Sequence, residues 1–343
     1  MSHEVEQMFS IEVPWHGLGE RIPEVVTAAV GIEKAGHQFE VELRDLFAGK
    51  PSPDVNVTEF TGRRATVRVN PDGTERILGV VGGRYAVIQN AAMWAFCETL
   101  AATGEAKYET AGTLANGRHV WAMARLSNCR VSIKGKDEIV PYLLITNSHD
   151  GTRALTAATI PFRVVCKNTL DAALTVASNA FQIYHVPSWQ AQVDQARDAL
   201  GLAVEYYEKF QDVGDLLASI EFGRRQVIEL TENLWPQQGK ELSGRRRRYR
   251  EVVLETWERE QGESPDFADS AWLAYNAVAR VADHRPTKGS RERVTQSIIF
   301  GGARQRLKNH ALDMIATMSG HPDLVRVGAP MNPEEDEEAG NGI

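Results

Sequence analysis

Polar side chains that could perform chemistry gather in the segment Thr146–Leu170. Its first part reads Ser-His-Asp-Gly at 148–151, where Asp150 and Gly151 suit a tight turn, because aspartate bonds its own turn backbone and glycine tolerates positive φ. His149 is not required by any turn, so His149 and Asp150 are the candidate catalytic residues, as a general base or metal ligands. Turn formation alone accounts for most of the motif, and we favour that interpretation.

Basic residues follow in the same segment. If Arg153 and Arg163 lie on neighbouring strands, they could share one sheet face and bind phosphate. Lys167 adds a charge, and Asn168 could begin a helix whose first amides would bind phosphate as well. A set of solvated strand charges explains the same residues equally well.

A second basic cluster contains five arginines within six positions: Arg245, Arg246, Arg247, Arg248 and Arg250, with Tyr249 between the last two. The five cannot all lie on one face of a helix, and glutamates such as Glu251 follow at four-residue offsets that permit pairing. The cluster is either a salt-bridged exposed helix or a phosphate-binding patch in which Tyr249 stacks on a base. Such charge density in an acidic chain favours the phosphate-binding patch.

Asp283 and His284 end a stripe of polar and aromatic residues at helical spacing that begins at Trp272. The pair could bind a metal ion, but no third ligand follows at a characteristic spacing, so we favour a buried polar network. The sequence contains no Gly-Lys-Ser/Thr phosphate loop. We expect neither a resident metal nor a cofactor.

The composition limits the classes of function. The chain has 343 residues, 43% of them hydrophobic, and a net charge of -8, so it is long enough for two domains and would repel nucleic acid except at a basic patch. Three scattered cysteines do not indicate a disulfide framework. Neither a secretory signal nor an apolar run of membrane-spanning length is visible. We expect a cytoplasmic protein.

The elements that position these residues change in kind near Pro187. Before it, alternating apolar residues and Asn-Gly or Asp-Gly turns predict an antiparallel sheet with packed helices. After it, helical periodicity dominates, and the chain ends in an acidic stretch. The predicted fold is α+β, with an α+β domain at 1–186, an all-helical region at 187–321 and a disordered acidic tail at 322–343.

Individual elements are predicted as follows. Strands are predicted over residues 37–43, 64–70, 76–81, 85–89, 107–114, 118–126, 138–146, 153–160, 162–166 and 181–186. Helices are predicted over 27–35, 91–103, 168–178, 188–218, 224–234, 246–259, 270–284 and 291–318.

Several blocks of the chain, in the same order, resemble the phage/plasmid-like protein family that carries domain of unknown function 932. They are PWHGLG at 14–19, VGGRYAVIQN at 81–90, KYETAG at 107–112, TNSHDG at 146–151, PFRVVCKNTL at 161–170 and NAVARVADH at 276–284. The resemblance covers nearly the whole chain except the acidic tail, and it departs from the family at Arg280 and Ala282. It implies a phage, prophage or plasmid gene in a bacterial host cell, and it supplies no catalytic residues.

The order of hairpins and a sheet-packed helix is also similar to the core of single-strand annealing recombinases, which hold a DNA strand in a basic groove and form rings or filaments. By this analogy of topology alone, we expect a non-enzymatic protein that binds or anneals single-stranded DNA in replication or recombination. We also expect a homo-oligomer, other replication or recombination proteins as partners, and no membrane partner.

Two alternatives stay open. One is a metal-dependent nuclease or hydrolase that uses His149 and Asp150 together with Asp283 and His284, which requires four residues distant in sequence to converge. The other is a structural or regulatory oligomer of a mobile element.

Overall fold

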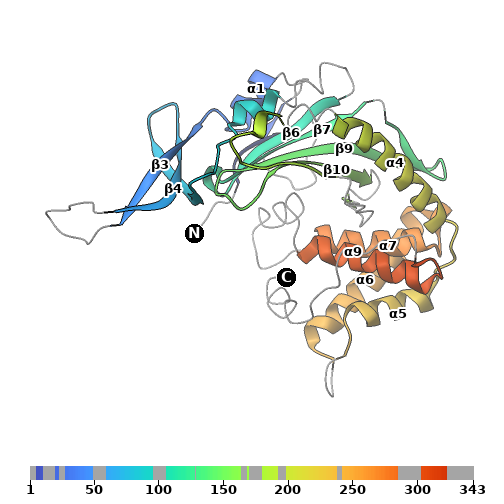
Figure 1. Cartoon of the computed structure of the whole chain (residues 1–343). Helices are drawn as coiled ribbons and strands as arrows, with labels where there is room; N and C mark the ends of the chain where they lie inside the picture. The colour runs from blue at the N-terminus through green and yellow to red at the C-terminus, as the bar shows by residue number, and fades with distance from the viewer. Residues whose placement is uncertain are drawn as a thin grey trace. The chain divides into compact units, whose positions relative to one another are not determined.

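The computed structural model is an α+β protein, as the sequence predicts (Figure 1). It describes residues 5–10, 20–22, 28–48, 59–95, 106–127, 129–163, 168–169, 180–191, 198–237, 242–284 and 303–322. Contacts divide the chain into two compact units. Unit 1 contains Met1–Asn128, Leu143–Ala158 and Ala180–Gly201, and unit 2 contains Cys129–Tyr142, Thr159–Asn179 and Leu202–Ile343. The two units alternate along the sequence, whereas the sequence predicts a single domain boundary near residue 187. The predicted domain bounds therefore stay a prediction.

The larger sheet has the strand order β11-β10-β9-β7-β6-β1-β2, with β12 paired to β10 and β8 to β9. Its strands are β1 (Val5–Ser10), β2 (Glu20–Arg21), β6 (Ala106–Leu114), β7 (His119–Leu126), β8 (Val131–Ile133), β9 (Asp137–Ser148), β10 (Leu155–Arg163), β11 (Asn168–Thr169) and β12 (Ala180–Ile183). The turn between β6 and β7 has φ of 60° at Asn116 and 95° at Gly117. The Asn-Gly sequence therefore supplies the left-handed backbone that this turn needs. Helix α1 (Ala28–Lys34) contacts β1 and β6.

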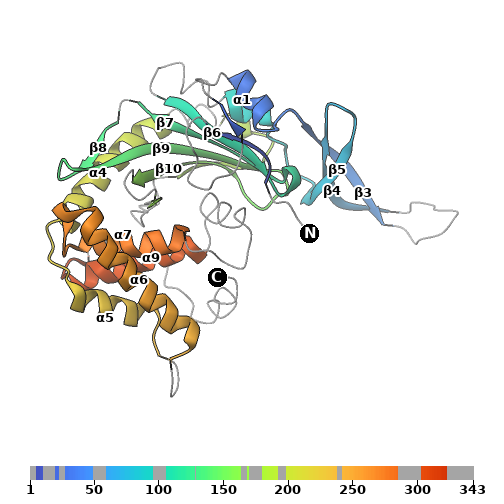
Figure 2. The same ribbon diagram turned by 180° about the vertical axis from the view of Figure 1, so that it is seen from behind.

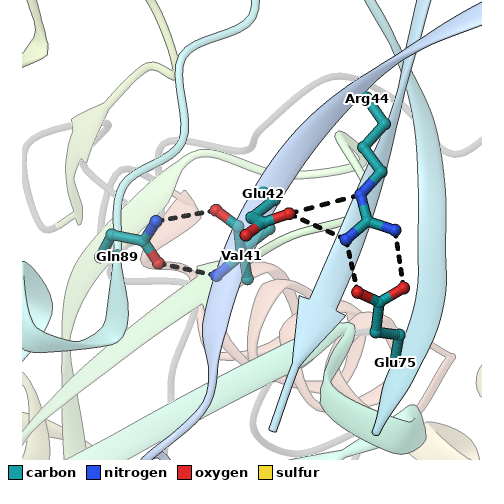
Figure 3. Close-up of polar contacts among 5 residues, drawn as sticks. All are labelled: Val41, Glu42, Arg44, Glu75 and Gln89. Carbon is teal, nitrogen blue, oxygen red and sulfur yellow. Dashed lines mark hydrogen bonds and ion pairs between the residues drawn. The ribbon is translucent and has the colours of Figure 1, made fainter. Parts of the chain in front are cut away.

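A three-stranded antiparallel sheet in unit 1 has the order β3-β4-β5, formed by β3 (Glu40–Ala48), β4 (Glu59–Val69) and β5 (Glu75–Gly82). Arg44 on β3 donates to both carboxylate oxygens of Glu75 on β5 at 2.6 Å, and to Glu42 at 2.9 Å (Figure 3). At the outer edge of β3, the Gln89 side chain donates to the Val41 carbonyl (2.8 Å) and accepts from the Val41 amide (2.9 Å). The Gln89 amide thus takes the place of a neighbouring strand at Val41.

Strand β5 lies against the bend that follows β9. A Cβ atom at Gly79 would lie 2.6 Å from Asp150 Cα, so no side chain fits between the two backbones. Gly151 has a φ of 79°, and a Cβ there would lie 2.8 Å from Cγ1 of Val81. Glycine at both positions is required by close approach, and at Gly151 by backbone conformation too.

Helices dominate unit 2: α4 (Asp198–Leu217), α5 (Arg224–Leu234), α6 (Gly244–Glu263), α7 (Ala271–His284) and α9 (Ala303–Met318). Helix α7 contacts α6 and α9, and α5 contacts the same two helices (Figure 2). Nearly all residues of α7 are buried, which marks it as the central helix of this group. Trp272 at its start donates from Nε1 to Asp137 Oδ2 (2.8 Å), and Asn276 donates to the Trp272 carbonyl (2.9 Å). Together with the buried Asp283, these bonds form the expected buried polar network on this helix, except that His284 is exposed.

Three local predictions are wrong. Residues 85–89 are not a strand, although the Ala86 amide donates to the His185 carbonyl (2.9 Å). Asn168 does not begin a helix, because it pairs with Arg163 as part of β11. The two strands expected at 153–160 and 162–166 are instead the single strand β10, and residues 164–167 lie outside the described residues.

No helix in the described residues has both the length and the apolar character needed to cross a membrane.

Replacing Gly79 with alanine should lower the free energy of unfolding by about 1–3 kcal/mol, because the new Cβ would overlap the Asp150 backbone. Urea-induced unfolding measures this difference. Gly82→Ala, on the same strand, is the matched control, since a Cβ at Gly82 would meet no atom within 4 Å. Equal stability of the two variants would contradict the close approach of β5 to Asp150.

Candidate nucleic-acid interface

The Ser148–Gly151 motif forms the end of β9 and a tight bend, as its turn residues predict. Asp150 Oδ1 accepts hydrogen bonds from the hydroxyls of Ser148 (2.6 Å) and Thr152 (2.5 Å) and from the Thr152 amide (3.0 Å). Burial acts to raise the pKa of Asp150, but the hydrogen bonds outweigh it, so this pKa lies below its usual value. Asp150 is thus committed to its own turn.

His149 is fully buried, with 0% of its surface exposed. Its amide donates to the Arg118 carbonyl (2.7 Å), and its Nε2 lies 2.8 Å from Asn90 Oδ1. The Asn90 amide nitrogen donates to the carbonyls of His37 (3.1 Å) and Phe39 (3.3 Å), so its oxygen accepts and the His149 proton is on Nε2. His149 Nδ1 has no hydrogen-bond partner in the described part of the chain.

His37 is held in its neutral form by geometry. Trp94 Nε1 donates to His37 Nδ1 (2.9 Å), so the proton is on Nε2, which donates to the Gly112 carbonyl (2.9 Å). A second proton on Nδ1 would place two N–H groups against each other. Burial lowers the pKa of His37 to about 4, although the bond to Gly112 opposes the shift.

Two more histidines complete what we call the histidine cluster: His37, His119, His149 and His185. His185 Nδ1 donates to the Ala86 carbonyl (3.1 Å) and its ring stacks on Tyr85 at 4.7 Å. Burial lowers the pKa of His185 to about 4, and burial together with the neighbouring histidines lowers that of His149 to about 3. His119 Nε2 lies 3.5 Å from Asp150 Oδ2, yet burial still lowers its pKa. The cluster is a buried, neutral part of the core, which does not favour proton transfer to an outside substrate.

The residues proposed for a metal-dependent reaction each have a separate environment. His149 and Asp150 belong to unit 1, whereas Asp283 and His284 belong to unit 2. Asp283 is buried and accepts from the buried Lys308 ammonium (3.1 Å), and His284 is exposed at the end of α7. Within the described ranges, no group of three or more His, Cys, Asp or Glu side chains is placed to hold a metal ion.

The basic residues after His149 lie at separate places along the chain, as far as the structure describes them. Arg153 is exposed in the bend before β10, whereas Arg163 is the last residue of that strand. At about 3.3 Å per residue, roughly 30 Å of chain separates them. Contrary to the expectation from the sequence, the two arginines are therefore not on neighbouring strands, and their role in binding phosphate stays a prediction. Lys167 lies outside the described residues, and Asn168 is in β11.

Three of the five arginines in the run on α6 make hydrogen bonds or ion pairs within unit 2. Arg246 donates to the Pro236 carbonyl (2.7 Å), and Arg250 donates twice to the Trp235 carbonyl (2.7 and 3.1 Å), so both satisfy carbonyls at the end of α5. Arg248 pairs with Glu251 and Glu255, each at 3.5 Å. Tyr249 is buried and stacks on Trp235 at 5.2 Å, so its ring is not available to a base.

Arg245 and Arg247, which we call the arginine pair, are exposed, and their guanidinium groups make no ion pair or hydrogen bond among the described residues. They lie in the first turn of α6, a 20-residue helix with no acidic residue in that turn. The positive end of the helix dipole and two uncompensated guanidinium groups both favour an anion here. Sequence reasoning identified this run but could not separate these two arginines from the three that have partners.

The buried network around Asn90 was not predicted from the sequence. Its only sequence signal is the block VGGRYAVIQN, whose last two residues supply the bridging amides.

Stability should fall as the pH is lowered through the titration range of the histidine cluster. An unfolded histidine takes up a proton near pH 6.5, at about its ordinary pKa, whereas His37 and His185 in the folded chain do so near pH 4. Between these values the unfolded state binds more protons. The free energy of unfolding should thus be constant above about pH 7 and decrease below about 6.5, by up to ~1.4 kcal/mol per pH unit for each ring. Urea unfolding at several pH values measures the slope.

His185→Phe keeps a ring stacked on Tyr85 but removes one titrating group, so the slope should become smaller. His321→Gln, at an exposed histidine outside the cluster, is the matched control and should leave the slope unchanged. An identical slope in His185→Phe and the unaltered chain would show that His185 is not a source of the pH dependence.

Comparison with known proteins gives a family but no activity. A family model described as "Domain of unknown function (DUF932)" matches residues 77–311. Searches of curated proteins and of solved structures find no match. The matched span contains Asn90, His149 and the arginine run of α6. Because it covers well over half of the chain, the protein belongs to the family defined by domain of unknown function 932.

Proposed function

We propose that this protein is a non-enzymatic DNA-handling protein that binds or anneals single-stranded DNA in the replication or recombination of a phage or plasmid. The observation that supports the proposal is the arginine pair at the start of α6, exposed and without partners in the described residues. Guanidinium groups bind phosphate through paired N–H donors, and each phosphate contact releases condensed counterions.

The distribution of charge supports binding over catalysis. The chain carries a net charge of -8, so a basic site must be local. The groups that an enzyme would need are committed elsewhere: His149 bonds Asn90, and Asp283 bonds Lys308. The arginine pair, by contrast, is exposed. The proposal includes the expected cytoplasmic location in a bacterial host, a homo-oligomer, and other replication or recombination proteins as partners.

Removing the arginine pair should weaken binding to single-stranded DNA. We expect Arg245→Ala/Arg247→Ala to lower the affinity for a labelled oligothymidylate by tenfold or more, and to reduce the slope of log affinity against log salt by about 1.4, since each contact contributes about 0.7 on single strands. Fluorescence anisotropy across a salt series measures both quantities.

Arg248→Ala is the matched control on the same helix, because Glu251 and Glu255 already balance that charge. It should change affinity and slope far less than Arg247→Ala does. If the unaltered protein shows no binding to single strands even at low salt, the proposed function is wrong. Equal losses in Arg247→Ala and Arg248→Ala would contradict the assignment to the arginine pair.

A further inference from the structure

The three-stranded sheet of unit 1 carries an exposed aromatic pair. Phe47 on β3 and Phe60 on β4 are direct cross-strand partners, with ring centroids 5.9 Å apart, and 54% and 47% of their surfaces are exposed. Two large apolar side chains half open to solvent contribute little to a core. Exposed aromatic rings of this kind are the usual stacking surfaces for unpaired bases.

Three glycines lie next to this aromatic pair. Gly62 follows Phe60 on β4 and has a φ of 72°, so its backbone requires glycine. Gly82 has no left-handed backbone, and a Cβ there would meet no atom within 4 Å, so neither conformation nor packing explains it. A Cβ at Gly83 would lie 3.3 Å from the Gly62 carbonyl oxygen, which places these residues together. Unexplained glycine in a strand often marks close approach of a ligand.

Arginines flank the same glycines. Arg63 is the cross-strand partner of Gly82, and Arg84 follows Gly83. Both are exposed, and their guanidinium groups make no ion pair or hydrogen bond among the residues that the structure describes, although the Arg63 amide donates to the Thr61 hydroxyl (3.3 Å). Arg64 donates to the Gly83 carbonyl, and Asp45 is its cross-strand partner on β3. The guanidinium groups of Arg63 and Arg84 thus lie beside glycine residues, where no side chain covers the backbone.

We propose that Phe47, Phe60, Arg63 and Arg84, around Gly62 and Gly82, form a binding surface for single-stranded nucleic acid, which we call the sheet platform. Bases stack on the phenylalanines, phosphates contact the arginines, and the glycines let the strand approach the backbone. This inference rests on the proposed function and adds a contact to bases, which the arginine pair of α6 does not provide.

A second copy of this chain is a poorer occupant of the sheet platform. In a two-fold pairing through this surface, Arg63 and Arg84 of one copy would lie close to the same arginines of the other, which repel them. The outer edge of β3 is also closed at Val41 by the Gln89 side chain (Figure 3). Single-stranded nucleic acid supplies both the anionic groups and the flat rings that these residues match.

The test compares two probes, an oligothymidylate and an abasic oligonucleotide of the same length, in anisotropy titrations of the full chain. Phe47→Ala/Phe60→Ala should weaken binding to oligothymidylate by about fivefold or more and leave the abasic probe unaffected, because only bases stack. Arg63→Ala/Arg84→Ala should weaken both probes and reduce the salt slope by about 1.4. Gly82→Ala should weaken both probes without loss of stability.

Arg76→Ala/Ile77→Ala is the matched control, since both residues are exposed on β5 away from the glycines. It should bind like the unaltered protein, and circular dichroism should show every variant folded. Unchanged binding in both the phenylalanine and arginine variants, while Arg245→Ala/Arg247→Ala binds more weakly, would overturn the sheet platform alone. If the unaltered protein binds neither probe, the proposed function and this inference fail together.

Discussion

Two adjacent side-chain amides, Gln89 and Asn90, hold the start of β3, which is an edge strand of its sheet in the described part of the chain. Asn90 donates to the carbonyls of His37 and Phe39, and Gln89 makes a two-bond pairing with Val41. The segment that contains them was predicted to be a strand, but it makes these contacts with its side chains and not through a backbone ladder. The start of the three-stranded sheet therefore depends on a few hydrogen bonds from side-chain amides.

The same network dictates the protonation state of the histidines. The Asn90 nitrogen donates to two carbonyls, which orients its oxygen toward His149, and His37 can accept from Trp94 only while it is neutral. A buried polar group that loses its partner costs about 1–3 kcal/mol, so removal of Asn90 or Trp94 would destabilise the histidines that they bond. In unit 2, buried polar groups are paired as charges: Lys308, which is 0% exposed, donates to the buried Asp283. Breaking such a pair leaves an uncompensated charge.

Local rules in the sequence were sufficient for much of the fold. Asn-Gly at 116–117 and Asp-Gly at 150–151 mark turns because few other residues adopt positive φ, and the helices after Pro187 follow from periodicity. Tertiary contacts decided the rest. Nothing local shows that Arg250 satisfies a carbonyl at Trp235, or that Glu251 pairs with Arg248 and not with Arg247. The sequence therefore predicts the run of arginines as a candidate site, but it does not predict that Arg245 and Arg247 are the two whose guanidinium groups are available.

Helix ends explain why the members of that run differ. Arg246 and Arg250 reach the carbonyls at the end of α5, where the helix dipole is negative and a cation is stabilised. Arg245 and Arg247 lie at the positive end of α6, where a cation is disfavoured by about 0.3–1 kcal/mol. The sequence has 46 acidic residues, yet none is in that first turn to relieve the repulsion. An arrangement that is unfavourable in isolation becomes favourable once an anion binds to either guanidinium group at this end of the helix.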